Sequence, residues 1–128
     1  MPHFEVHYSA NLEERADVPS LCEAIRQAAL STGHFETGGI RVRAIRCDSY
    51  AVADAHPDNA FVDIWVKIGV GRSAEEKKTI GKTVFDAAAQ CLAAQFEAPH
   101  LAMSLEIREI NPELSWRKNS IHPRLRST

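Results

Sequence analysis

Residues 61–92 have the sequence FVDIWVKIGVGRSAEEKKTIGKTVFDAAAQCL, which predicts a strand, a glycine-containing loop and a helix in succession. Apolar residues alternate in its first part, as in a strand that buries one face: Val62, Ile64, Val66 and Ile68. Glu76 follows Ser73 at the spacing of a capping box and therefore marks the start of a helix. Helical spacing then places these residues on one stripe: Ile80, Val84, Phe85, Ala88, Cys91, Leu92 and Phe96.

The same order of elements is expected in the N-terminal part of the chain. A strand is predicted at about residues 2–8, where apolar and polar residues alternate. Asp17 is typical of an N-cap and Gly33 of a helix end, so a helix is expected between them. The stretch GIRVRAIRC, residues 39–47, then alternates as a strand. LAMSLEIREI, residues 101–110, is the corresponding strand after the second helix.

These elements predict an α+β fold in one domain, residues 1–128. Two β-α-β units, about residues 2–47 and 60–110, form a pseudo-repeat, and residues 111–128 form an irregular tail. Because a β-α-β crossover makes its strands parallel, the units together predict a four-stranded mixed sheet with both helices on one face. The strands contain so many apolar residues that we expect the other face to be apolar as well and covered by a partner, which predicts an oligomer.

Two expectations concern the segments between and after these units. Ala51, Val52 and Ala53 predict a short edge strand. In the tail, Trp116 and Ile121 are expected to pin the chain onto the sheet or onto a neighbouring subunit.

The composition argues against several classes of protein. The 128 residues are 45% hydrophobic and carry a formal net charge of −2, with no basic excess for a nucleic acid or a membrane surface. No apolar run is long enough to span a bilayer, and the N-terminus lacks the basic and apolar regions of a signal peptide. Cys22, Cys47 and Cys91 do not have the spacing of a disulfide scaffold. We therefore expect a cytoplasmic protein without nucleic-acid or membrane partners.

Residues 69–74, GVGRSA, match the pattern G-x-G-x-x-A between a predicted strand and a predicted helix. A dinucleotide-binding fingerprint has this context but needs an acidic residue about 20 residues further on, at the end of the next strand. Here that position falls inside the helix, near Ala89 and Gln90. The loop instead predicts a small anion site, in which N–H groups at the helix start and the guanidinium of Arg72 bind a carboxylate.

Other charged residues give weaker indications. Arg41 lies at the start of its predicted strand, close to a loop, where sites tend to form, whereas Arg43 is expected on a solvated strand face. His3 and His7 share a strand face but lack a third ligand, and the histidines as a set have no spacing typical of metal ligands. We therefore expect no metal site.

Pro2 stands at the start of the first predicted strand and has two interpretations. It is either a proline that the first residue of an edge strand tolerates, or a catalytic residue. A small second residue permits removal of Met1, which makes the rigid secondary amine of Pro2 the N-terminus. Burial and nearby guanidinium groups would lower the pKa of this amine and suit it to act as a general base.

Several stretches together carry a family resemblance over nearly the whole chain. They are MPHFEVHYS, TGHFETGGIRVR, FVDIWVKIGVGRS, LAMSLEIREINPEL and KNSIH. The segment around GRS resembles 4-oxalocrotonate tautomerases. The chain as a whole resembles the double-length 5-carboxymethyl-2-hydroxymuconate Δ-isomerases of the same superfamily.

The resemblance implies a tautomerase fold assembled as a homotrimer and an isomerase that uses no cofactor. Pro2 matches the N-terminal proline that is the general base of the family. Arg41 matches the arginine of GIRxR and Arg72 that of GRS, and both are expected to bind substrate carboxylates and to polarise the carbonyl. The implied reaction is a 1,3-proton shift that converts a dienol di- or tricarboxylate of homoprotocatechuate breakdown into a conjugated oxo-acid.

Two alternatives remain open at this point. The resemblance is loose in YAVADAHPDN, residues 50–59, so one alternative is a tautomerase or related dehalogenase that acts on a different enol acid, such as phenylpyruvate. The other is a non-catalytic trimeric binding protein of the same fold. Retention of Met1 would favour the second alternative, because an acylated Pro2 nitrogen is not a base.

Overall fold

The computed structural model describes residues 1–127. The first β-α-β unit comprises β1 (His3–Ser9), α1 (Val18–Ser31) and β2 (Arg41–Cys47). The second comprises β3 (Ala60–Ile68), α2 (Ala74–Cys91) and β4 (Leu101–Glu109). Shorter helices connect or follow these elements: η1 (Ala10–Glu14), η2 (Thr37–Gly39), α3 (Ala93–Phe96), η3 (Pro112–Leu114) and α4 (Ile121–Arg126). Within residues 1–127, none of the helices has both the length and the apolar character needed to cross a membrane.

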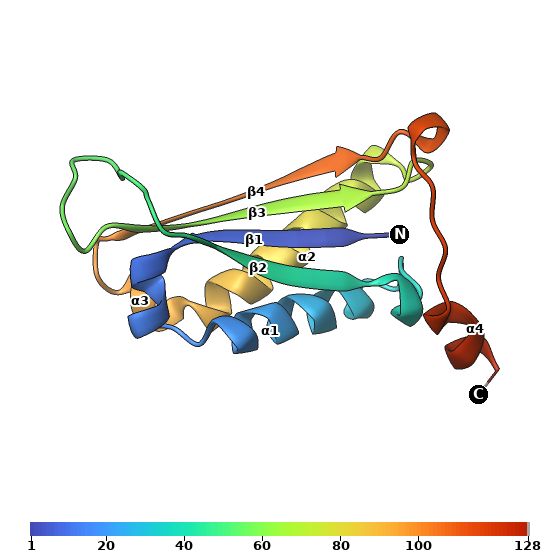
Figure 1. Cartoon of the computed structure of the whole chain (residues 1–128), viewed down its shortest axis with the longest axis horizontal. Helices are drawn as coiled ribbons and strands as arrows, with labels where there is room; N and C mark the ends of the chain where they lie inside the picture. The colour runs from blue at the N-terminus through green and yellow to red at the C-terminus, as the bar shows by residue number, and fades with distance from the viewer. Residues whose placement is uncertain (128) are drawn as a thin grey trace.

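The strands form one mixed sheet in the order β2-β1-β3-β4 (Figure 1). β1 and β2 are parallel, β3 and β4 are parallel, and the central strands β1 and β3 are antiparallel. Consequently β1 and β2 begin at the end of the sheet where β3 and β4 finish. At that end His3 pairs with Arg41 on one side and with Lys67 on the other. The predicted α+β fold with a four-stranded mixed sheet is confirmed.

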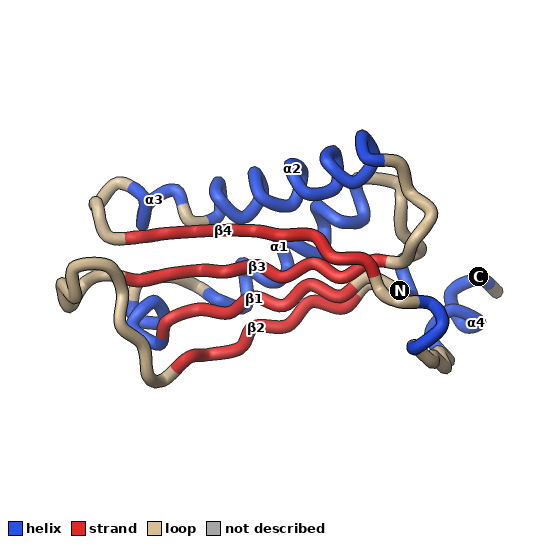
Figure 2. Tube along the Cα trace, turned by 90° about the horizontal axis from the view of Figure 1, so that it is seen from above, coloured by secondary structure: helices blue, strands red, loops and turns tan. Residues whose placement is uncertain are grey.

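Both long helices lie on one face of the sheet (Figure 2), and the local signals that start and stop them are those predicted. The Asp17 carboxylate accepts a hydrogen bond from the backbone N–H of Ser20 at 3.2 Å, and Gly33 ends the region of α1 with a φ of 74°. Ser73 and Glu76 form the expected capping box at the start of α2.

The core lies between the sheet and the two helices. Alternate residues of the central strands are buried there: Phe4, Val6, Tyr8, Val62, Ile64, Val66 and Ile68. The helices contribute Leu21, Ile25, Ala29, Ile80, Val84 and Ala88. The buried face predicted for the second helix included too many residues, because Phe85 of α2 and Phe96 of α3 are 36% and 41% exposed.

The opposite face of the sheet is mostly polar, so the expectation of two apolar faces was wrong. Glu5 lies on this face with 13% of its side chain exposed, and its carboxylate oxygens are 3.4 Å from both Arg43 Nη2 and Lys67 Nζ. Trp65 is partly exposed there and packs against His7, with the ring centroids 4.4 Å apart. Successive strand residues point to opposite faces, so an apolar strand needs apolar residues only at every second position. An apolar second face therefore does not support the predicted oligomer.

Residues 51–53 do not form the expected edge strand. Ala53 and Ala55 have φ values of 52° and 65°, in the left-handed region, which is incompatible with an extended strand. The Asn59 side chain donates a hydrogen bond to the carbonyl oxygen of Val52 at 3.1 Å and closes the segment into a turn.

The C-terminal tail is not irregular throughout, because it ends in helix α4. The tail leaves β4, passes the N-terminus at the end of the sheet and places α4 beside η2 (Figure 1). Within residues 1–127, Trp116 and Ile121 do not pin it onto the sheet, since they are 87% and 48% exposed, and their expected contact with a neighbouring subunit stays a prediction. The attachment is polar instead: Arg126 donates two hydrogen bonds to the Glu36 carboxylate, at 2.6 and 2.7 Å.

Candidate active site

The strand directions bring the three predicted site residues to one end of the sheet. Pro2 precedes β1, Arg41 is the first residue of β2, and Arg72 follows the end of β3. The backbone N–H of Arg41 donates to the carbonyl oxygen of Pro2 at 3.3 Å, which extends the β1–β2 pairing by one residue. Pro2 is buried.

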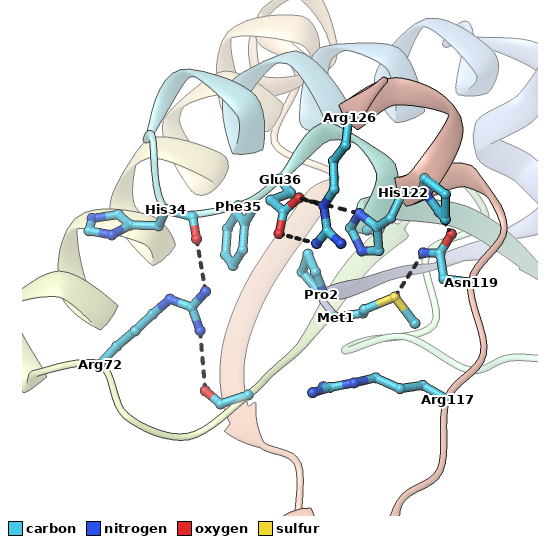
Figure 3. A pocket seen from close by; sticks show the side chains of 13 residues that line it. Met1, Pro2, His34, Phe35, Glu36, Arg72, Arg117, Asn119, His122 and Arg126 are labelled. Carbon is cyan, nitrogen blue, oxygen red and sulfur yellow. Dashed lines mark hydrogen bonds and ion pairs between the residues drawn. The ribbon is translucent and has the colours of Figure 1, made fainter. Parts of the chain in front are cut away.

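A cavity of about 560 Å³ lies at this end of the sheet (Figure 3). Its wall combines the N-terminus, the segment before η2, the loop after β3 and the C-terminal tail. The lining residues that matter chemically are Pro2, Phe35, Arg72, Arg117, Asn119 and His122. Pro2 and Arg72 therefore share one cavity, as their predicted roles require.

Arg72 is held in place from its own loop and from the segment after α1. Its Nη2 donates to the carbonyl oxygen of His34 at 2.9 Å, and its Nη1 donates to that of Gly69 at 3.3 Å. The guanidinium carbon also lies 4.7 Å from the centroid of the Phe35 ring, a cation–π contact. A guanidinium has five N–H groups, so donors remain for a bound carboxylate.

The N-terminus of α2 has fewer free N–H groups beside Arg72 than we expected. The Ser73 hydroxyl accepts from the backbone N–H of Glu76 at 3.1 Å, and the Glu76 carboxylate accepts from the backbone N–H of Ser73 at 2.9 Å. Glu75 adds a second acidic side chain to the first turn. The capping box thus uses two of the donors that an anion could bind, which leaves a larger share of the binding to the arginine side chains.

Arg41 lines a second cavity of about 450 Å³, which adjoins the first and shares Met1, Gly69 and Arg117 with it. Its Nη2 lies 3.0 Å from Nε2 of His3. Burial and, to a smaller extent, the charges of Arg41 and Arg43 lower the pKa of His3 to about 4. His3 is therefore neutral at physiological pH and does not cancel the charge of Arg41.

Met1 lies between the two cavities and lines both. Burial lowers the pKa of the N-terminal amine, and the guanidinium groups of Arg117, Arg41 and Arg72 lower it further. Three arginines from three separate segments thus each lower the pKa of the amine at Met1.

Several residues of the tail were missed by the sequence reasoning. Arg117 lines both cavities, Asn119 Nδ2 lies 3.0 Å from the Met1 sulfur, and His122 packs against Gly38. The one available signal was the KNSIH stretch, which supported the family resemblance without an assigned role. Spacing along the chain did not indicate Arg117, since its position depends on the path of the tail across the end of the sheet.

A cluster of possible metal ligands lies at the other end of the sheet. One ligand atom from each of His56, Asp58 and His100 lies within 4.8 Å of the others. The rings of the two histidines stack with centroids 4.2 Å apart, and Nδ1 of His56 accepts the backbone N–H of Asp58 at 3.1 Å. These contacts hold the turn before β3. A metal bound through Nδ1 of His56 would have to displace the hydrogen bond from Asp58.

The whole-chain comparison decides the family. The family model for 5-carboxymethyl-2-hydroxymuconate isomerase matches residues 2–125. The chain belongs to the 5-carboxymethyl-2-hydroxymuconate isomerase family. The resemblance predicted from the sequence is thereby confirmed.

Relatives of this isomerase family match over almost the entire chain. The 5-carboxymethyl-2-hydroxymuconate Delta-isomerase of Escherichia coli is 38% identical over 122 residues, which cover 95% of this chain and 97% of the relative. The crystal structure of a 5-carboxymethyl-2-hydroxymuconate isomerase from Deinococcus radiodurans R1 is 39% identical, has a TM-score of 0.89, and the match covers 97% of this chain and 93% of that one.

The fold extends to more distant proteins. The symmetric trimer of the wild-type fused 4-OT called W0 matches with a TM-score of 0.63 at 17% identity, over 91% of this chain and 93% of that one. At this identity the match shows a shared fold, which is the tautomerase fold that the resemblance implied.

Proposed function

We propose that this protein is a 5-carboxymethyl-2-hydroxymuconate isomerase that moves a proton within its substrate without a cofactor, in homoprotocatechuate breakdown. The observation that carries the proposal is the position of Pro2, buried at the start of β1 beside Arg72 in the larger cavity and adjacent to the cavity of Arg41. The names of the relatives supply the substrate, and the arrangement of these residues suits the chemistry.

Removal of Met1 is the first step of this proposal. Because Met1 lines both cavities, its loss joins them and places the secondary amine of Pro2 at the junction. The same burial and the same arginines that lower the pKa at the present N-terminus would act on this amine. A larger fraction of it is then unprotonated near neutral pH and available as a base.

The reaction needs one base that both takes and returns the proton, and positive charge where the dienolate develops. In our proposal the Pro2 amine accepts the enol proton and the resulting ammonium group delivers it to a carbon of the same molecule. Arg41 and Arg72 bind substrate carboxylates and stabilise the negative charge that develops on oxygen. Guanidinium groups suit this role because they bind carboxylates through two parallel hydrogen bonds.

The proposed assembly is a homotrimer. The W0 relative with the same fold is a symmetric trimer, and no helix within residues 1–127 covers the second face of the present sheet (Figure 2). The apolar surface available for contact includes Trp65 on this face and Leu114 and Trp116 in the tail.

We also retain the cytoplasm as the proposed location, since Cys22, Cys47 and Cys91 are unpaired, as in a reducing compartment.

The proposal is tested by turnover of a panel of enol acids with protein whose intact mass is known. We expect the highest kcat/KM with 5-carboxymethyl-2-hydroxymuconate, and lower values with 2-hydroxymuconate and with enol phenylpyruvate. A preference for phenylpyruvate would assign a different tautomerase activity. No turnover of any acid by protein that lacks Met1 would favour a binding protein of the same fold.

A further inference from the structure

Arg117 is the guanidinium that the two cavities share. The larger cavity contains Arg72, the smaller contains Arg41, and Arg117 lines both. Figure 3 shows its side chain extending from the tail beneath Met1, toward the side of the cavity on which Arg72 lies. It therefore occupies the position between the other two arginines of the site.

The charge of Arg117 is not neutralised. Among residues 1–127, no hydrogen bond, ion pair or ring contact engages its side chain. The carboxylate of the larger cavity, Glu36, is already occupied by the bidentate bond from Arg126. A guanidinium in a cavity, without a counter-charge and with all its donors available, is suited to bind a carboxylate of a ligand.

The tail is anchored immediately after Arg117. Asn119 donates from Nδ2 to the carbonyl oxygen of Gly38 at 2.9 Å, and its Oδ1 accepts the backbone N–H groups of Ile121 and His122 at 2.7 and 3.1 Å. His122 packs directly against Gly38. These contacts fix the backbone near Arg117, so the fold holds the start of its side chain at the wall of both cavities.

We propose that Arg117 binds the carboxylate of the carboxymethyl branch of the substrate and so selects the tricarboxylate over unbranched dicarboxylates. The inference rests on the proposed function. It assigns a specificity role to a residue of the tail, outside the two β-α-β units.

The shape of the substrate matches the three arginines. 5-Carboxymethyl-2-hydroxymuconate is a linear six-carbon diacid with a branch that carries a third carboxylate. A linear chain that spans the joined cavities places its two end carboxylates near Arg72 and Arg41, which lie in different cavities. The branch leaves the chain at carbon 5, beside one end carboxylate, and Arg117 lines both cavities, so it adjoins whichever of them holds that end.

The test compares two substrates in three variants: Arg117→Ala, Arg117→Gln and, as a control in the same tail, Arg124→Ala. The substrates are 5-carboxymethyl-2-hydroxymuconate and 2-hydroxymuconate, which lacks the branch. Values of kcat/KM are taken on the pH-independent plateau, because Arg117 lowers the pKa of the Met1 amine and its loss is expected to change that of the Pro2 amine as well. Sedimentation checks that each variant retains the oligomeric state of the wild type.

Both Arg117 variants should lose about tenfold or more in kcat/KM for the tricarboxylate, and at most about threefold for the dicarboxylate, whereas Arg124→Ala should resemble the wild type. Equal losses for both substrates, or no loss for either, would overturn the role of Arg117. A wild-type protein without Met1 that turns over neither acid would instead overturn the proposed function, so the two failures are distinguishable.

Discussion

At the residue scale, the arginines around the N-terminus differ in what holds them. Arg72 is fixed by two backbone carbonyl groups and an aromatic ring, and Arg41 by a neutral histidine. Neither contact contributes a negative charge. Each guanidinium therefore keeps its charge for a ligand, and each also disfavours a proton on the N-terminal amine between them.

The strongest prediction at this scale concerns Pro2. Protein that retains Met1 should have a kcat/KM lower by a factor of about 10²–10⁴, the usual contribution of general acid–base catalysis, because an amide nitrogen does not accept a proton at neutral pH. Pro2→Ala should keep the oligomer and lose less activity, since a primary amine is still a base. Intact mass and kinetics on the same preparation provide the measurement, and full activity with Met1 attached would contradict the mechanism.

The pH dependence follows from the same amine. Burial and the charges of Arg117, Arg41 and Arg72 lower the pKa of the Met1 amine below its ordinary value of 8.0, and we expect them to lower that of the Pro2 amine in the same way once Met1 is removed. The unprotonated amine is the active base, so kcat/KM should rise with pH and level off at a pH below 8. Arg72→Gln removes a positive charge, raises the pKa and should move this ascending limb to higher pH. An unmoved limb would show that another group titrates.

Arg72→Ala and Arg41→Ala should each lower kcat/KM by about tenfold or more while the fold is kept. The reason is the loss of hydrogen bonds to a charged carboxylate, which contribute about 1.5–3 kcal/mol each. Lysine at either position should restore activity only in part, because it lacks the bidentate geometry. Arg26→Ala removes an exposed arginine of α1 that pairs with Glu23 and serves as the control. Unchanged kcat/KM in both alanine variants would show that Arg41 and Arg72 are surface charges that do not bind the substrate.

At the scale of elements, the junction between η2 and α4 closes the site. Gly38 and Gly39 of η2 are buried beneath His122, and Glu36 just before η2 binds Arg126 in α4. A helix as short as α4 has little stability of its own, so tertiary contacts must hold it. The small glycine residues are needed because the tail lies so close to them.

Gly38→Ala tests this junction. A Cβ atom at this position would lie 2.9 Å from His122 Nδ1, 3.1 Å from its backbone nitrogen and 3.2 Å from its Cα, so the backbone of the tail has to move. We expect a loss of about 1–3 kcal/mol in the free energy of unfolding, measured with urea. At Gly69 a Cβ atom meets nothing within 4 Å, so Gly69→Ala is the matched control. Equal stability of the two variants would show that α4 is not tightly packed.

At the scale of the whole molecule, one face of the sheet is packed against helices and the other carries charges held in pairs. Glu5 is largely covered although it lies on the face without helices, because Arg43 and Lys67 enclose it. Burial of Glu5 raises the pKa of its carboxyl group, but Arg43, Lys67 and His7 outweigh this effect, and the pKa is lowered. A face with paired charges favours a polar, specific contact between subunits over a purely hydrophobic one.

We predict a trimer, or a multiple of it, in solution. The reasons are the uncovered sheet face, the exposed side chains of Trp65 and Trp116, and the trimeric assembly of a protein with the same fold. Sedimentation at micromolar concentration measures the mass. A monomer at that concentration would contradict the assembly, and the site would then have to function within a single chain.

The sequence by itself determined the two β-α-β units and the parallel pairing within each. Capping signals at Asp17 and Ser73 and alternation along the strands are local, so they depend only on neighbouring residues. The β-α-β order fixed which strands are parallel. The antiparallel contact between β1 and β3, which the sequence analysis did not predict, placed the beginnings of two strands and the ends of the other two at one end of the sheet, and so brought Pro2, Arg41 and Arg72 to that end.

Tertiary structure alone decided the rest of the candidate site. Arg117 is distant from Pro2 along the chain, and its position depends on a tail held by single polar contacts at Asn119 and Arg126, which have no periodic pattern. Trp116 does not attach the tail to the sheet of its own chain, because it remains exposed there. Local signals set secondary structure through short-range geometry, whereas the path of an irregular tail depends on partners distant in the sequence, and only the folded chain brings them together.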